Sequence, residues 1–133
     1  MKKSKIKMLT LVMMVALMII VCFAASATEA YFSNAKLYPT QYSVVKGANK
    51  TNSGTYATLS LETISAITGS SYSKSYVYVK VGAGGTAVKA YANNSVNLTL
   101  TGGYQTAGVY VPLYGMSADS SHNCLITGYW NVH

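Results

Sequence analysis

Apolar and polar side chains alternate along most of the chain after residue 30, with a period close to two. This period is typical of β-strands that bury one face. The clearest strand runs from Ser75 to Val81, where three valines on one face alternate with two tyrosines and a lysine on the other. Further strands are predicted at Ala35 to Val45, broken by Pro39, and at Thr55 to Ile67, Ala87 to Ala92, Ser95 to Thr101, Val109 to Tyr114 and Asn123 to Val132.

Some residues interrupt the regular alternation. Pro112 cannot donate a ladder hydrogen bond, so its strand is expected at a sheet edge or beside a bulge. Gly128 indicates a bulge or a close approach of two backbones. The alternation changes phase after Leu61, which predicts a bulge near Glu62 or a change from strand to turn. The alternative is a short helix from Leu61 to Ile67.

Clusters of Gly, Asn and Ser separate these segments and are typical of turns. Their spacing predicts an all-β fold, a single antiparallel β-sandwich of about seven strands. We find no repeat of fixed period and no linker within residues 31–133, so this part of the chain is expected to form one domain.

The first thirty residues have a different character. Four lysines lie within the first seven positions, and an uncharged apolar run follows from Met8 to Phe23. This is the composition of a secretory signal peptide. The run is shorter than the roughly 20 residues that span a bilayer, so we expect a cleaved signal and no transmembrane segment in the mature protein.

Cleavage after Ala27 or after Ala30 fits the preference for small residues at such sites. The branched Val21 before Cys22 is unlike a lipid-attachment signal, so a free, extracellular product is expected. The predicted organisation is therefore a signal peptide, residues 1–30, followed by a β-sandwich domain, residues 31–133.

Cys124 is the single cysteine after Ala30, so the mature chain cannot form an internal disulfide. Two interpretations are open: a small residue packed in the core, which we prefer, or an exposed thiol that joins two copies. The sequence does not fix the oligomeric state.

The formal net charge of the whole chain is +7. Because six lysines and two carboxylates follow Ala30, the mature charge is +4. These lysines are scattered, and the chain has no arginine, the residue best suited to bidentate contacts with phosphate and guanine. Nucleic acid is therefore excluded as a partner, whereas a mild attraction to anionic cell walls or lipid headgroups is retained.

Residues suited to catalysis are few. Glycoside hydrolysis usually needs two carboxyl groups that flank one bond, and only Glu62 and Asp119 are present after Ala30. An extended strand would place His122 and Cys124 on one face, as a thiolate–imidazole pair requires. No motif for an oxyanion hole or an orienting group accompanies them. We predict no enzymatic activity, no cofactor and no metal site.

Tyrosine is the residue that suggests a function. All twelve tyrosines follow residue 30. Four of them, Tyr76, Tyr78, Tyr110 and Tyr114, lie opposite the apolar faces of their predicted strands. Outward aromatic rings of this kind stack on sugars or form adhesive contacts, and they also stabilise a sheet by cross-strand pairing. These four are the candidate binding residues.

The lysine-rich start, the short β domain, the segment Lys89-Ala90-Tyr91 and the ending Gly128-Tyr129-Trp130 are the features that support a family comparison. In these features the chain resembles small exported Gram-positive proteins of unknown function and, distantly, bacteriocins of the lactococcin kind. The resemblance implies an exported protein that acts at the envelope of a bacterial cell, and it assigns no role to individual residues.

Three functional hypotheses follow. The first is a secreted, non-catalytic interaction protein that acts at the bacterial cell envelope in a bacteriocin-like manner. The second is a small extracellular module that binds a glycan or the cell wall through the outward tyrosines. The third is a hydrolase that depends on Cys124 and His122.

Overall fold

The computed structural model describes residues 28–133. The apolar run from Met8 to Phe23 and Cys22, on which the signal peptide prediction depends, lie outside the described residues. Residues 28–133 include no helix with the length and apolar character needed to cross a membrane. Their elements are β1 (Thr28–Leu37), β2 (Ser43–Asn49), β3 (Tyr56–Ala66), β4 (Tyr76–Val81), β5 (Val88–Tyr91), β6 (Asn94–Thr99), the 3-10 turn η1 (Gly102–Tyr104), β7 (Tyr110–Ser117) and β8 (Cys124–Val132).

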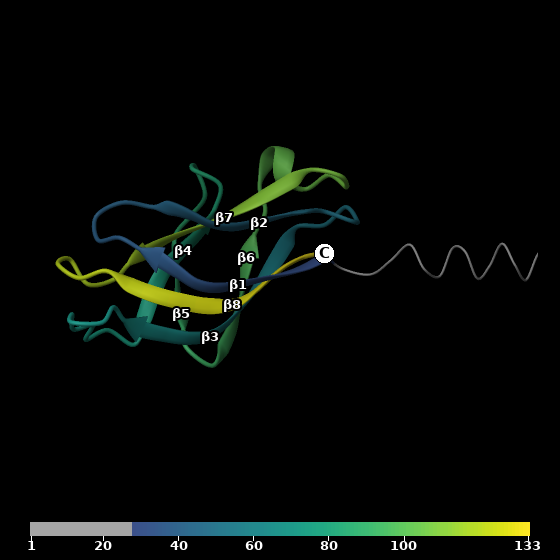
Figure 1. Ribbon diagram of the computed structural model, residues 1–133. Coiled ribbons are helices and arrows are strands. Elements are labelled where there is room, and N and C mark those ends of the chain that lie inside the picture. The colour runs from purple at the N-terminus through teal and green to yellow at the C-terminus, as the bar shows by residue number, and fades with distance from the viewer. Residues whose placement is uncertain (1–27) are drawn as a thin grey trace, which may run out of the picture.

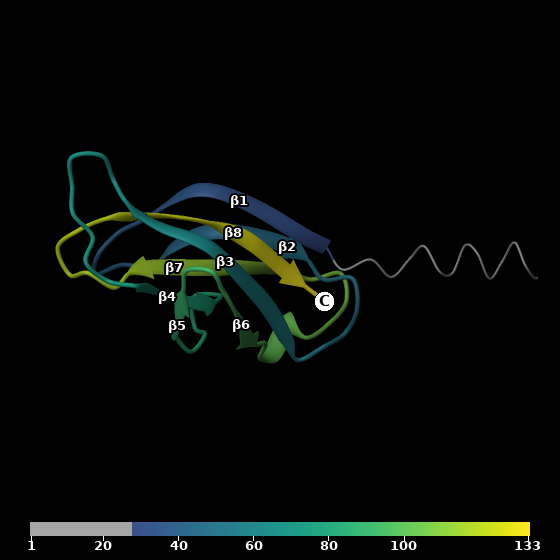
Figure 2. The same ribbon diagram turned by 90° about the horizontal axis from the view of Figure 1, so that it is seen from below.

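The strands form two antiparallel sheets of four strands each, in the orders β1-β8-β3-β6 and β2-β7-β4-β5. Figure 2 shows β1, β8 and β3 in one layer and β7 in the other. The edge strands of the two sheets lie close together, β1 beside β2 and β6 beside β5. The start of β1 and the end of β8 are neighbours (Figure 1), because Thr28 is in register with Val132.

The core lies between the two sheets and is built from the apolar positions of each alternating strand. In β8 every second residue is fully buried, as the burial pattern from Cys124 to Val132 shows. Trp130 is the largest of these residues, and its indole Nε1–H donates to the carbonyl oxygen of Val111 at 3.0 Å. Since Trp130 belongs to β8 and Val111 to β7, this hydrogen bond joins the two sheets through the core.

The all-β prediction is confirmed, but the strand number was too low by one. The segment Ala35 to Val45 is broken at Pro39, as the sequence indicated, and its ends belong to β1 and β2, which lie in different sheets. Pro39 lies between them and cannot supply a ladder hydrogen bond. The first strand also begins earlier than predicted, at Thr28.

The prediction that Pro112 lies on an edge strand is wrong, because β7 lies between β2 and β4. The carbonyl oxygen of Pro112 accepts a hydrogen bond from Gly82 N–H, just past the end of β4. In an antiparallel strand the N–H and C=O of one residue point to the same neighbouring strand. The nitrogen of Pro112, which carries no hydrogen, therefore points to the side of β4, at a level where β4 has already ended. The alternative, that Pro112 lies beside a bulge, agrees better with the structure. The register of β2 against β7 shifts between Val44 and Lys46.

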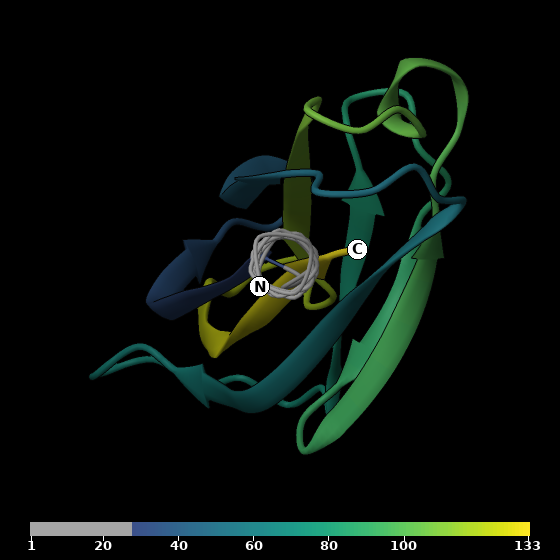
Figure 3. The ribbon, with the colours of Figure 1, turned by 90° about the vertical axis from the view of Figure 1, so that its right-hand side faces the viewer.

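The phase change after Leu61 is a β-bulge, as predicted, and the alternative of a short helix is wrong. The register of β3 against β8 shifts between Leu61 and Thr63, which makes Glu62 the extra residue. Gly128 of β8 is opposite Leu61, and a Cβ there would lie 2.3 Å from the carbonyl oxygen of Ser60. The close backbone approach predicted for Gly128 is therefore present. Figure 3 shows β3 and β6, in teal and green, running side by side.

Candidate interaction surface

The four tyrosines predicted from the sequence lie on one face of one sheet. Tyr76 and Tyr78 belong to β4, and Tyr110 and Tyr114 belong to the adjoining strand β7. In both strands the residues between them are buried, so these tyrosines point away from the core. The alternation seen in the sequence is therefore sufficient to place all four rings on the outer side of the β2-β7-β4-β5 sheet.

Lysines are interleaved with these rings because of the strand register. Tyr78 is paired with Lys89 of β5 on one side and with Met116 of β7 on the other. Lys80 is paired with Tyr114, and Tyr76 with Tyr91. We call this surface the tyrosine–lysine face, and it consists of Tyr76, Tyr78, Tyr91, Tyr110, Tyr114, Lys80 and Lys89.

The rings of this face contact one another and the lysines. Tyr76 packs against Tyr78 edge to face, with ring centroids 5.6 Å apart, and against Tyr91 at 5.6 Å. The ammonium group of Lys89 lies 4.5 Å from the centre of the Tyr76 ring. Cation–π and aromatic contacts of this kind stabilise the side chains in fixed orientations.

Tyr42, in the loop that precedes β2, borders the same face. The ammonium group of Lys80 lies 4.2 Å from the centre of its ring. Burial, and then the neighbouring hydroxyl of Tyr78, raise the pKa of Tyr42. This phenol therefore remains neutral at physiological pH and acts as a hydrogen-bonding group beside a lysine.

The tyrosines differ in exposure. Tyr110 is 55% exposed and Tyr91 is 43% exposed, whereas Tyr76, Tyr78 and Tyr114 are half-buried. The ring of Tyr110 covers Gly47 of β2, where a Cβ would overlap it. The face therefore has its most accessible rings at its two ends, with a tightly packed centre.

None of the three acidic side chains of the chain belongs to the tyrosine–lysine face. Glu29 is on β1 and Glu62 on β3, both in the other sheet, and Asp119 is in the loop between β7 and β8. The positive charges of Lys80 and Lys89 are thus unopposed by carboxylates on their own surface. A uniform sign of charge attracts ligands of the opposite sign.

The thiolate–imidazole pair of the third hypothesis has no support in this structure, since Cys124 is buried and His122 contacts Asp119. Cys124 begins β8 and is fully buried, in agreement with the core interpretation. Burial raises the pKa of its thiol, so it is protonated at neutral pH and is a poor nucleophile. His122 precedes the strand, and its Nδ1 lies 3.1 Å from Oδ2 of Asp119.

Asp119 and Ser117 hold the loop before β8 together. Asp119 Oδ1 accepts from Ser121 N–H at 2.9 Å, and the Ser117 hydroxyl donates to the carbonyl oxygen of His122 at 2.7 Å. The hydrogen bond from the Ser121 backbone is the main reason that the pKa of Asp119 is lowered. Asp119 therefore fastens a turn. Within residues 28–133, no three His, Cys, Asp or Glu side chains gather in a set suited to a metal ion.

Sequence reasoning missed Tyr42, Lys89 and Tyr91. The signal for the last two was present, since both follow the period of the predicted strand Ala87 to Ala92. The contact between Lys80 and Tyr42 depends on the fold of a loop and has no sequence signal. Comparisons with models of protein families, with curated proteins and with solved structures find no match for this chain.

Proposed function

We propose that this chain is an exported β-sandwich protein that acts without catalysis, by binding anionic polymers of a bacterial cell envelope through its tyrosine–lysine face. The signal peptide features of residues 1–30 support export. The observation that carries the binding function is the interleaving of Lys80 and Lys89 with tyrosine rings on a surface that has no carboxylate. A bacteriocin-like action on cells is one consequence of such binding.

Charge favours an anionic partner over a neutral one at this face. A lysine close to an anionic surface contributes about 1 kcal/mol, so two lysines contribute about 2 kcal/mol, which is about thirtyfold in affinity. Salt screens such contacts over about 8 Å at physiological ionic strength. Binding through this face should therefore weaken steadily as salt is added.

The ring geometry argues against sugar stacking on the same face. The Tyr76 ring is already covered by Lys89 on its face and flanked by Tyr78 and Tyr91. A sugar would have to displace these contacts. The tyrosines instead hold the lysines in place and supply phenol hydroxyls to phosphate or carboxylate oxygens.

Sedimentation with purified Gram-positive cell walls tests the proposal. The protein should sediment with intact walls at low salt and should stay in solution with walls stripped of their anionic polymers. The double variant Lys80→Gln, Lys89→Gln should bind about 10- to 30-fold more weakly. The matched control is Lys36→Gln, Lys74→Gln, which removes the same charge from β1 and from the loop before β4.

Equal loss of binding in both double variants would show that net charge alone matters. That result would contradict a specific role of the tyrosine–lysine face in binding. Binding that is unchanged at high salt would do the same. Growth assays on a panel of Gram-positive cells test the bacteriocin-like action separately, because binding without growth inhibition removes only that part of the proposal.

A further inference from the structure

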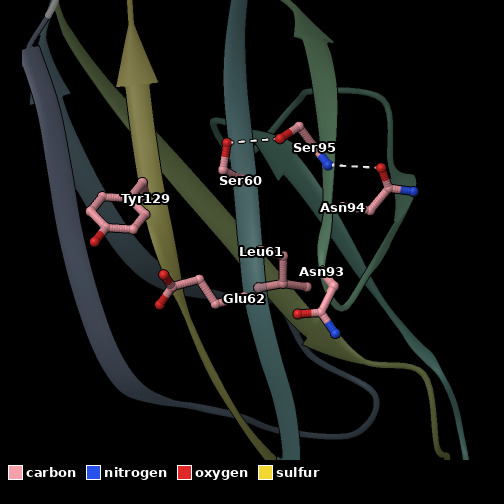
Figure 4. Close-up of a pocket in the computed structure, with 7 residues that line it drawn as sticks. All are labelled: Ser60, Leu61, Glu62, Asn93, Asn94, Ser95 and Tyr129. Atoms are coloured by element: carbon pink, nitrogen blue, oxygen red, sulfur yellow. Dashed lines mark hydrogen bonds between the residues drawn. The ribbon is translucent and has the colours of Figure 1, made fainter.

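A second candidate site lies on the other sheet, in an open groove of about 520 Å³ that crosses β8, β3 and the start of β6. Figure 4 shows Tyr129 on β8, Glu62 and Ser60 on β3, and Asn93 and Asn94 at the entry to β6. Glu62, Asn93 and Asn94 are exposed, and Tyr129 is half-buried. The chain crosses from one sheet to the other at this point, between β5 and β6.

The polar side chains of this groove are fixed by the backbone beneath them. Glu62 is the extra residue of the bulge in β3, and bulges commonly re-aim a side chain. The backbone N–H of Asn93 donates to the carbonyl oxygen of Glu62 at 3.2 Å, which ties the turn before β6 to the bulge. Asn93 has a φ of 56°, a left-handed conformation that asparagine tolerates.

Aromatic, hydroxyl and amide groups line the same groove. The ring of Tyr129 is braced by Tyr31, with centroids 5.0 Å apart. Asn94 Oδ1 accepts from Ser95 N–H at 3.0 Å, which leaves its amide N–H groups as donors, and the hydroxyls of Ser60 and Ser95 are 2.8 Å apart. A ring for stacking, amides that both donate and accept, and a carboxylate match the hydroxyl pairs of a sugar ring.

The charge in the groove selects a neutral partner. Glu62 is its only ionisable group apart from the phenol of Tyr129, and among residues 28–133 it forms no ion pair. A carboxylate repels polyanions and accepts hydrogen bonds from hydroxyl groups. This is the opposite preference to that of the tyrosine–lysine face.

We propose that this groove binds a neutral oligosaccharide, with Tyr129 as the stacking platform and Glu62, Asn93 and Asn94 as the hydrogen-bonding groups. The site shares no lining residue with the centre of the tyrosine–lysine face, and the proposal stands without the envelope-binding function.

The groove continues into a smaller depression of about 120 Å³. The two share Asn94 and Ser95, and the smaller one extends to Lys89 and Tyr91 at the edge of the other sheet. A sugar chain that follows both depressions contacts more protein than a single unit does. The ligand is therefore a linear chain of several sugars.

Calorimetric titration of the folded protein with neutral hexasaccharides and disaccharides of glucose, N-acetylglucosamine and mannose tests this inference. Asn93→Gly removes the amide and keeps the left-handed turn, so it should weaken hexasaccharide binding by about five- to tenfold. Glu62→Gln should weaken it by a similar factor. Tyr129→Ala should weaken it by more than about tenfold.

The matched control is Asn34→Gly. Asn34 is an exposed asparagine of β1 with a φ of 52°, so the change removes the same group from the same backbone conformation outside the groove. It should leave binding unchanged. Tyr91→Ala should weaken the hexasaccharides and leave disaccharide binding as it was, because only the longer chain reaches Tyr91.

The proposal is overturned if none of these sugars binds at about 10 mM, a concentration that reveals even millimolar affinity. It is also overturned if Asn93→Gly and Glu62→Gln both bind as the unchanged protein does, or if the groove accepts a basic peptide and no sugar. Wall binding that is lost in Lys80→Gln, Lys89→Gln but kept in Asn93→Gly and Glu62→Gln would separate this site from the proposed envelope-binding surface.

Discussion

At the scale of single residues, Trp130 joins the two sheets through the core. Its ring is fully buried and its indole N–H reaches the backbone of the opposite sheet. A buried acceptor that loses its donor costs about 1–3 kcal/mol, and the smaller ring of a replacement leaves a void.

We expect Trp130→Phe to lower the free energy of unfolding by about 2–4 kcal/mol. Urea denaturation followed by circular dichroism measures this change. Tyr38→Phe, which alters an exposed ring outside the core, is the control and should be neutral. Equal stabilities for the two variants would contradict the structural role of the indole.

Tyr72 and Cys124 should make stability fall at alkaline pH. Burial raises the pKa of Tyr72 to about 12 and also raises the pKa of Cys124. Both groups keep their protons in the folded state at a pH where the unfolded chain has lost them. Their stabilising contribution is therefore complete at neutral pH and is lost as the pH rises from about 9 to 12.

The measurement is the urea midpoint against pH for the unchanged protein and for Tyr72→Phe. The variant should be less stable at pH 7, because the Tyr72 hydroxyl donates to the carbonyl oxygen of Tyr76 at 2.7 Å and accepts from Ala118 N–H. The difference between the two proteins should shrink above about pH 10. Lys50, whose pKa burial lowers, has the opposite pH dependence in both proteins and cancels in the difference.

At the scale of elements, period two was enough to predict most strands and their faces. The alternation of Val77, Val79 and Tyr78 gave both the strand and its outer side, and the phase change after Leu61 gave the bulge. Sheet membership was not predictable, because pairing depends on contacts between residues far apart in the sequence. For that reason the two sides of the break at Pro39 could not be assigned to different sheets, and Pro112 was placed at an edge.

Gly128 gives a test at this scale. Gly128→Ala places a Cβ 2.3 Å from the carbonyl oxygen of Ser60, so β8 and β3 must separate. We expect a loss of more than about 2 kcal/mol in unfolding free energy, with amide exchange accelerated in both strands. Gly84→Ala, where no atom lies within 4 Å of the new Cβ, is the matched control and should be close to neutral.

The bounds of β1 yield a prediction about processing. Thr28, Glu29 and Ala30 are in register with residues of β8. Of the two cleavage sites predicted from the sequence, the one after Ala27 keeps these pairs and the one after Ala30 removes them, so we expect the proposed signal to be cleaved after Ala27. Mass spectrometry of the product gives its first residue. A chain that begins at Tyr31 should be less stable by about 1–3 kcal/mol, and equal stability would count against this argument.

At the scale of the whole molecule, the two sheets carry opposite chemical characters on their outer sides. One combines tyrosines with Lys80 and Lys89, and the other has the groove with Glu62. The sequence predicted the four tyrosines of the first surface from their alternation. It did not predict the groove, because Tyr129, Glu62 and Asn93 come from three segments whose proximity arises only from the order β8-β3-β6.

The position of β8 affects how the chain acquires its structure. This strand is the last in the described chain, yet it lies between β1 and β3 and supplies Trp130 to the core. In a growing polypeptide that lacks β8, β1 has no partner strand in its sheet and the core lacks Trp130. Early collapse of such a polypeptide therefore gains little free energy. We therefore expect such a polypeptide to stay unfolded until β8 has been synthesised, which is the state that the proposed export requires.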